Sequence, residues 1–146
     1  MFSPSRAGRV HVARELLYIG HKPGLRDVLT VMEQLRSSAA LAGRPCTEGE
    51  ALAALVPVGL EQAVGLRIAQ LSEGQRRRAA LASLWLPRVA PLWLLDEPLA
   101  ALDAAMCDRL AQRLDWHADD GGSAVFTSHQ ALPLKRGVRS LRLGGY

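Results

Sequence analysis

LSEGQRRRAALASLWLPRVAPLWLLDEPLAALD, residues 71–103, is the stretch that decides the fold of this chain. It opens with a Ser/Gly turn, continues as a helix predicted over 75–86, and reaches the apolar run LWLL at 92–95. Such a run is typical of a parallel strand covered on both faces. Asp96 and Glu97 follow it directly, at the sheet edge where open α/β folds bind ligands. The stretch therefore predicts a layered α/β sheet with an acidic site at one edge.

The rest of the chain is predicted to alternate strands and helices, which favours a mostly parallel sheet. We expect a poorly ordered lead-in over 1–14, a buried strand at 15–19, another short strand at 123–128, and a last edge strand in the tail near 138–143.

Helical spacing of apolar residues predicts helices over 25–41 and 103–117. In the first of these, Thr30 and Glu33 are expected on the faces that the apolar residues do not use. Thr47 and Glu50 have the spacing of a capping box and predict a further helix that ends near Pro57. A turn and a short helix are expected over 60–70.

Composition places the chain among ordinary globular proteins: 146 residues, 49% hydrophobic and 22% charged, suffice for one domain with a core. The net charge of +4 comes from scattered arginines without interleaved aromatic residues, so we expect no nucleic-acid partner. Cys46 and Cys107 have no CxxC spacing, which argues against a disulfide framework or a zinc site. Without a membrane-spanning run, a cytosolic location is expected.

Two carboxylates at a strand end can serve a metal-dependent reaction. Asp96 could hold Mg²⁺ through oxygen ligands, which this cation prefers. Glu97 could orient or deprotonate an attacking water, help that is typically worth about 10²–10⁴ in rate. A strand end that merely exposes two carboxylates is the plainer alternative.

The Ser/Gly turn before the predicted helix can bind an anion. Ser72 can cap the helix, and Gly74 can let a phosphate approach the backbone. The free N–H groups and the dipole of a helix N-terminus attract such groups. An ordinary N-cap is the plainer interpretation of Ser72 taken alone.

Taken together, LSEGQ, LWLLDEP, Ala101-Leu102-Asp103 and a strand ending at His129 resemble the ATP-binding subunits of ABC transporters. The patterns RRAALASLWL at 77–86 and YIGHKPGL at 18–25 resemble those of the haem exporters of cytochrome c maturation. The resemblance covers about residues 15–130. It implies a partial ABC ATPase core of the P-loop NTPase class, with a helical subdomain over about 25–70. The signature, Walker B, D-loop and switch histidine then lie within 71–130.

The resemblance implies a role for each matching residue. Asp96 is then the Walker B ligand of Mg²⁺, Glu97 the catalytic carboxylate, and His129 the histidine that senses the γ-phosphate of ATP. Further nucleotide-binding positions are those of the signature and the D-loop, namely Ser72, Gly74, Gln75 and Asp103. In the family, the signature serves ATP held by the opposing subunit of a head-to-tail dimer. Membrane permease subunits of the exporter are the implied partners, at the cytoplasmic face of the inner membrane.

Two departures from the family pattern change the expectation. The sequence contains no Gly-x4-Gly-Lys-Ser/Thr, the Walker A loop that cradles phosphates, and no Gly-Lys pair. We therefore expect an N-terminally truncated subunit that is inactive alone. Lys22 stands where the family has the Q-loop Gln; an ammonium only donates hydrogen bonds, so Lys22 either points away or contacts phosphate. Glu73 adds a carboxylate to the signature and would weaken phosphate binding unless it faces outward.

Three alternatives remain open. The chain could be a degenerate, non-catalytic subunit that lends its signature to a partner, although Glu97 and His129 count against it. It could serve another ABC transporter. A chromosome-maintenance ATPase shares the motifs, but the long heptad coiled coils of that class are missing from the sequence.

Overall fold

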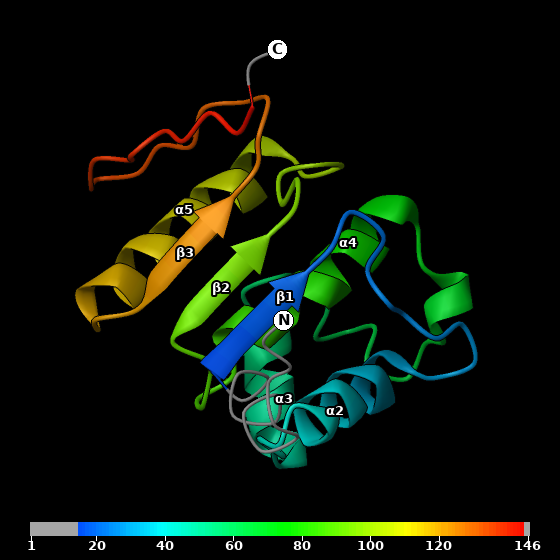
Figure 1. Ribbon diagram of the computed structural model, residues 1–146. Coiled ribbons are helices and arrows are strands. Elements are labelled where there is room, and N and C mark those ends of the chain that lie inside the picture. The colour runs from blue at the N-terminus through cyan, green and yellow to red at the C-terminus, as the bar shows by residue number, and fades with distance from the viewer. Residues whose placement is uncertain (1–14, 145–146) are drawn as a thin grey trace, which may run out of the picture.

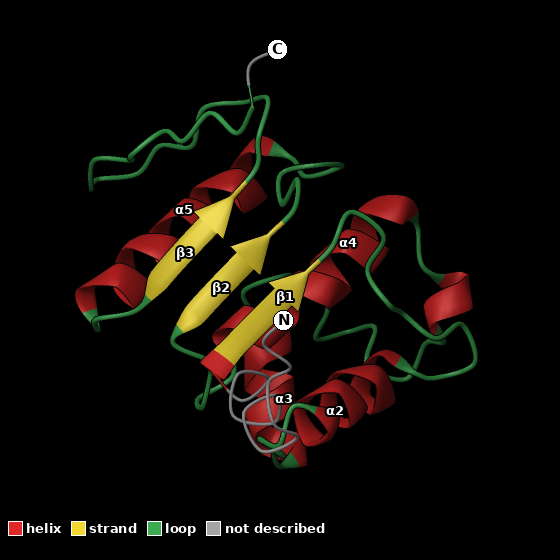
Figure 2. Cartoon of the chain, in the orientation of Figure 1, coloured by secondary structure: helices red, strands yellow, loops and turns green. Residues whose placement is uncertain are grey.

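A computed structural model describes residues 15–144 of the protein (Figures 1 and 2). Three strands, β1 (Leu16–Ile19), β2 (Leu92–Leu95) and β3 (Ser123–Phe126), form a sheet in the order β1-β2-β3. Both pairs are parallel, and Leu95 lies in register with Ile19 and Phe126. The three strands therefore end at one edge of the sheet, which confirms the predicted α/β class. The predicted lead-in over 1–14 lies outside the described residues.

Each α-helix of the described chain begins at a side-chain cap. The helices are α2 (Val31–Leu41), α3 (Glu48–Leu55), α4 (Glu73–Leu81) and α5 (Ala104–Asp119), with 3₁₀ turns η1 (Ile68–Gln70) and η2 (Ala82–Trp85). Full capping boxes, in which cap and third residue satisfy each other's backbone N–H, start the first three of these α-helices. Their cap residues are Thr30, Thr47 and Ser72.

The helix predicted over 25–41 begins later than expected. Thr30 accepts a hydrogen bond from the Glu33 N–H, and the Glu33 carboxylate accepts one from the Thr30 N–H. This box starts α2 at Val31, and Val28 before it is exposed. The predicted start at residue 25 was wrong, because polar side chains three residues apart can set a helix start. Likewise, the helix predicted over 75–86 starts at Glu73 and tightens to η2 after Leu81.

Two hydrophobic clusters form the core. One lies among α2, α3 and the segment up to Leu71, and the other between the sheet and the helices α4 and α5. Trp85, Val89 and Leu102 pack against both clusters. The segment 71–103 therefore joins the two halves of the core.

One face of the sheet is covered and the other is open. On the covered face Trp93 and Leu95 are buried with residues of α5, and Figure 1 shows the helices behind the strands. On the other face Tyr18 is 63% exposed and Val125 is 54% exposed. The prediction of strands covered on both faces was therefore wrong for the described residues. LWLL is apolar throughout, yet only every second side chain meets the core.

The tail does not pair with the sheet. Within the described part of the chain, residues 127–144 form no strand, and Val138, Leu141 and Leu143 are exposed, so the expected last edge strand was wrong. Among residues 15–144, no helix is long and apolar enough to cross a membrane.

Candidate functional site

Asp96 lies immediately beyond β2, in line with the ends of the neighbouring strands. Its N–H donates to the Ile19 carbonyl at 2.9 Å, which extends the pairing of β1 with β2 by one residue. On the other side, the Thr127 hydroxyl donates to the Asp96 Oδ1 at 2.8 Å. The same hydroxyl oxygen accepts from the Glu97 N–H at 2.9 Å. Thr127 therefore holds the carboxylate of one residue and the backbone of the next.

Glu97 and His129 meet at this edge. The His129 Nε2 lies 3.0 Å from the Glu97 Oε1, and the side chains are 91% and 27% exposed, respectively. Glu97 has φ of +50°, in the left-handed region that a residue with a side chain seldom adopts. Such backbone strain is concentrated at functional sites and persists only where neighbours fix it. The structure places Asp96, Glu97 and His129 at one edge of the sheet.

The signature turn is closed on itself as a helix cap. The Ser72 Oγ accepts from the Gln75 N–H at 3.2 Å, and the Gln75 Oε1 accepts from the Ser72 N–H at 2.9 Å. This is the plainer of the two interpretations offered for Ser72. Glu73, the first residue of α4, is exposed, and it lines the same cavity as Lys22.

Gly74 approaches the loop that precedes α5. A Cβ at this position would lie 3.2 Å from the Ala101 carbonyl oxygen, tighter than most contacts of a Cβ. Ala101 also has a left-handed backbone, with φ of +60°. Asp103 caps α5 by accepting from the Met106 N–H at 2.8 Å, and its other oxygen lies 3.5 Å from the Arg78 guanidinium. The glycine therefore has a packing reason within this chain, besides the phosphate approach proposed from sequence.

Arg77 connects α4 to both strand ends. It is buried, and its guanidinium donates to the carbonyls of Gly20, Asp96 and Glu97. Burial lowers the pKa of the Arg77 guanidinium, while the negative charges of Asp96 and Glu97 act to raise it. Sequence reasoning missed both Arg77 and Thr127. Parallel register places Thr127 beside Asp96 and could have identified it, whereas an Arg in a run of three carries no such signal.

Lys22 lies exposed in the loop after β1 and, among the described residues, forms no ion pair. It lines a cavity of about 520 Å³ together with residues of α4 and of the loop before α5, including Glu73, Arg76, Arg77 and Ala101. The cavity joins the signature turn to the loop that holds Lys22. Lys22 is therefore free to reach a ligand from solvent.

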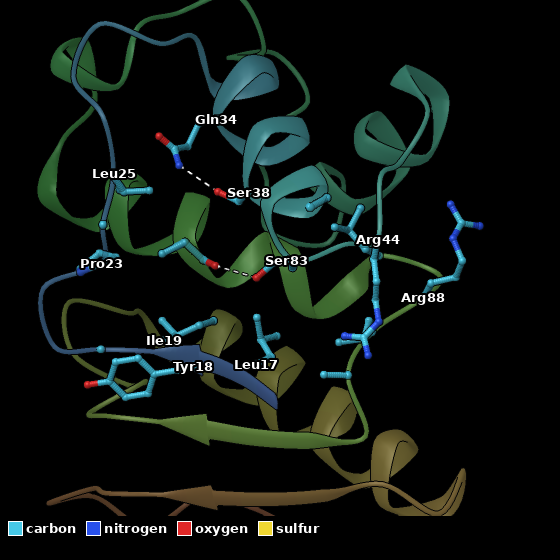
Figure 3. A pocket seen from close by; sticks show the side chains of 18 of the residues that line it. Leu17, Tyr18, Ile19, Pro23, Leu25, Gln34, Ser38, Arg44, Ser83 and Arg88 are labelled. Atoms are coloured by element: carbon cyan, nitrogen blue, oxygen red, sulfur yellow. Dashed lines mark hydrogen bonds between the residues drawn. The ribbon is translucent and has the colours of Figure 1, made fainter. Parts of the chain in front are cut away.

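A second cavity, of about 220 Å³, opens between β1 and α2 (Figure 3). The Gln34 amide, which donates to the Ser38 Oγ at 3.0 Å, is on its α2 wall. Arg88 stands at its rim and pairs with Glu50 at 3.0 Å. Its lining includes Leu17, Ile19, Pro23, Leu25, Arg44 and Ser83. The cavity therefore combines an apolar floor with basic and amide groups at its wall and rim.

The acidic edge suits Mg²⁺ as a shared ligand. Within residues 15–144, no three His, Cys, Asp or Glu side chains are grouped as an all-protein metal cage. Mg²⁺ uses one or two carboxylates and fills its shell with water and phosphate oxygens. Asp96, half-buried and held through Oδ1 by Thr127, has the donor chemistry that such a site needs.

Residues 14–134 match a family profile described as "AAA domain, putative AbiEii toxin, Type IV TA system", and the chain belongs to that AAA domain family. Its resemblance to ABC ATP-binding subunits is confirmed by curated relatives. It is 45% identical over 130 residues to the cytochrome c biogenesis ATP-binding export protein CcmA of Aromatoleum aromaticum, covering 89% of this chain and 61% of that protein. The CcmA of Cupriavidus necator is 44% identical over 140 residues, 96% of this chain and 60% of the relative.

Solved structures confirm the fold. The dimeric structure of MJ0796, a bacterial ABC transporter cassette, matches with a TM-score of 0.75 at 24% identity, over 88% of this chain and 58% of that one. A second structure of MJ0796 shows a post-hydrolysis state bound to ADP and Pi. The chain spans about three fifths of the length of the curated relatives it matches.

Proposed function

We propose that this chain is the ATP-engaging part of an ABC transporter subunit that drives haem export for cytochrome c biogenesis. The observation that carries the proposal is the Glu97–His129 pair, 3.0 Å apart and beside Asp96, at the carboxyl ends of β2 and β3. In an open α/β sheet this edge is where a ligand binds. The relatives' names supply the export role in cytochrome c biogenesis, which their match to this chain supports. Haem as the cargo rests on the resemblance of residues 18–25 and 77–86 to the haem exporters.

In the proposed reaction, a water oxygen bonds to the γ-phosphorus of ATP while the bond from that phosphorus to the β–γ bridging oxygen breaks, which releases ADP and phosphate. Glu97 orients that water and accepts its proton, and His129, exposed on the outer side of Glu97, contacts the γ-phosphate and holds the carboxylate. Mg²⁺, held by Asp96, would neutralise phosphate charge. Thr127 fixes Asp96 and Glu97 relative to each other.

The signature turn belongs to a second site. Ser72, Gly74 and Gln75 stand at the start of α4, where N–H groups and the helix dipole favour an anion. We propose that this turn contacts ATP held by a second subunit in a head-to-tail dimer, with Asp103 and the loop before it at the dimer interface. Lys22, exposed on the neighbouring loop, would reach phosphate directly.

The cavity of Figure 3 is the proposed contact with the membrane permease. It lies between the sheet and α2, the first helix of the proposed subdomain over 25–70. One or two side chains of the permease, at the cytoplasmic face of the inner membrane, would enter it. Ser38→Trp, which blocks the cavity, should abolish co-purification with the permease, whereas Arg36→Trp on an exposed turn of α2 should not.

ATP hydrolysis tests the catalytic part. The chain alone is expected to show no MgATP turnover, since no Gly-x4-Gly-Lys is present in it. Joined to the N-terminal part of the Aromatoleum relative, residues 15–146 should hydrolyse MgATP, and Glu97→Gln should lower the rate by about 10²–10⁴. A folded chimera that binds permease but never hydrolyses ATP would favour the non-catalytic subunit instead. Turnover by the chain alone, lost in Glu97→Gln, would refute the expected inactivity.

A further inference from the structure

Arg77 is the most buried cation of the described chain, with 5% of its surface exposed. It reaches its partners from the middle of α4. One terminal nitrogen donates to the Gly20 carbonyl at 2.9 Å, and the other donates to the Asp96 carbonyl at 2.7 Å and to the Glu97 carbonyl. Burying a guanidinium among neutral carbonyls carries a large desolvation cost. A plain apolar side chain would fill the same space without that cost, so the cation calls for a reason.

The reason lies in the backbone of Glu97. Its φ of +50° is unfavourable for a residue with a side chain, and it persists only where neighbouring groups hold it. Two hydrogen bonds hold the residue from both ends. The N–H donates to the Thr127 hydroxyl, and the C=O accepts from Arg77. The Ala100 N–H donates to the same carbonyl at 3.1 Å and closes the turn.

The left-handed backbone decides where the carboxylate points. The Cβ direction of a residue follows from its backbone dihedral angles, so relaxation of φ to a negative value would swing the side chain away. With the present φ, the Glu97 Oε1 lies 3.0 Å from the His129 Nε2. That pair depends on a conformation that the polypeptide would not adopt unaided.

We propose that Arg77 is the positioning residue of Glu97: by binding the carbonyls of Asp96 and Glu97, it holds the turn after β2 in the conformation that brings Glu97 to His129. The catalytic meaning of this positioning rests on the proposed function, but the geometry does not. Arg77 belongs to the helix whose first turn carries Ser72 and Gly74. The signature turn and the Glu97 carboxylate are therefore linked through one rigid helix and one side chain.

The test uses the full chain, without nucleotide, labelled with ¹³C and ¹⁵N in its histidine rings. Glu97→Gln removes the carboxylate that lies 3.0 Å from the His129 Nε2, and the variant marks the ring resonances of His129 without that partner. Arg77→Met should shift the His129 ring resonances most of the way to the positions that they have in Glu97→Gln. His117, stacked on the buried Trp93 at the other end of the sheet, reports on the core and should stay in place. Arg76→Met is the matched control one residue away and removes an arginine that pairs with Asp27. It should shift the ring resonances of neither His129 nor His117.

Each possible result of this experiment either supports or contradicts the proposal that Arg77 positions Glu97. His129 resonances at the parent position in a folded Arg77→Met chain would overturn the proposal. Equal displacement of His129 and His117 would also overturn it, because it indicates general loosening. If Arg77→Met does not fold, Arg77→Lys keeps the charge and stem but loses the planar fork that serves both strands. Arg77→Lys should shift the His129 ring resonances part of the way to their positions in Glu97→Gln. Unshifted His129 resonances in Arg77→Lys would overturn the proposal. This experiment uses no ATP, so its result does not depend on whether the ATPase assay of the proposed function succeeds.

Discussion

Gly74 and Gly49 form a matched pair that tests whether the signature glycine is required by packing within this chain. Each is the second residue of a helix that begins with a capping box, Gly74 in α4 and Gly49 in α3. A Cβ added at Gly49 meets nothing closer than the Thr47 Oγ1 at 4.0 Å, whereas one at Gly74 lies 3.2 Å from the Ala101 carbonyl oxygen. The two substitutions therefore share their helix chemistry and differ in the space available.

The magnitude follows from that difference. Replacing a helical glycine by alanine gains roughly 0.5–1 kcal/mol of stability when the site is open. We expect Gly49→Ala to show this gain. At Gly74 the same gain is opposed by forcing Ala101 to move, and overpacking typically costs about 1–3 kcal/mol. Gly74→Ala should therefore be less stable than Gly49→Ala by at least about 1 kcal/mol.

Urea unfolding followed by tryptophan fluorescence measures both variants against the parent chain, since Trp93 is fully buried. Ala101→Gly relieves the left-handed strain at φ of +60° and should recover part of the Gly74→Ala loss in the double variant. Equal stabilisation by Gly74→Ala and Gly49→Ala would refute the packing explanation and leave the phosphate approach as the reason for the glycine.

Two further predictions concern Thr127 and His117. Thr127→Val keeps the shape but removes the hydrogen bonds to Asp96 and Glu97, and should cost about 0.5–1.5 kcal/mol in urea unfolding because these bonds are exposed to water. Thr127→Ser keeps the hydroxyl and should stay near the parent in stability. A Thr127→Val variant as stable as the parent would show that these hydrogen bonds do not stabilise the fold. Burial lowers the pKa of His117 from its usual 6.5, so the unfolded chain binds the proton first. Stability should be full above pH 6.5 and fall below it; His117→Gln should flatten that decline, and an unchanged slope in this variant would assign it to other groups.

Local chemistry made several parts of the fold predictable. The Thr47–Glu50 box, the cap at Ser72 and the apolar run at 92–95 each act through neighbours within four residues, and all three are present. The start of α2 was misjudged although Thr30 and Glu33 were visible, because apolar spacing was given more weight than capping. The open face of the sheet depends on what packs against it, which a strand's own composition does not determine.

The position of Asp96, Glu97 and His129 at one edge of the sheet follows from the sequence, whereas the contacts that hold them do not. Asp96, Glu97 and His129 follow strands whose parallel register brings them to one edge. Arg77 lies 20 residues before Glu97, and its hydrogen bonds run to main-chain carbonyls, which every residue carries. No choice of residue type at 96 or 97 reveals that contact. The left-handed φ at Glu97 could not be predicted from the sequence either, because glycine is the residue that usually marks such positions.

The open face of the sheet has a consequence for anyone who purifies this chain. Tyr18, Leu92 and Val125 present apolar surface on three adjacent parallel strands, and β1 and β3 are edge strands within residues 15–144. Edges and faces of this kind recruit other copies of the same chain. We therefore expect copies of this chain to associate as the protein concentration rises, and light scattering should increase before the solubility limit is reached. Lysine substitutions at Tyr18 and Val125 are a simple way to obtain the monodisperse sample that measurement of the histidine ring resonances requires.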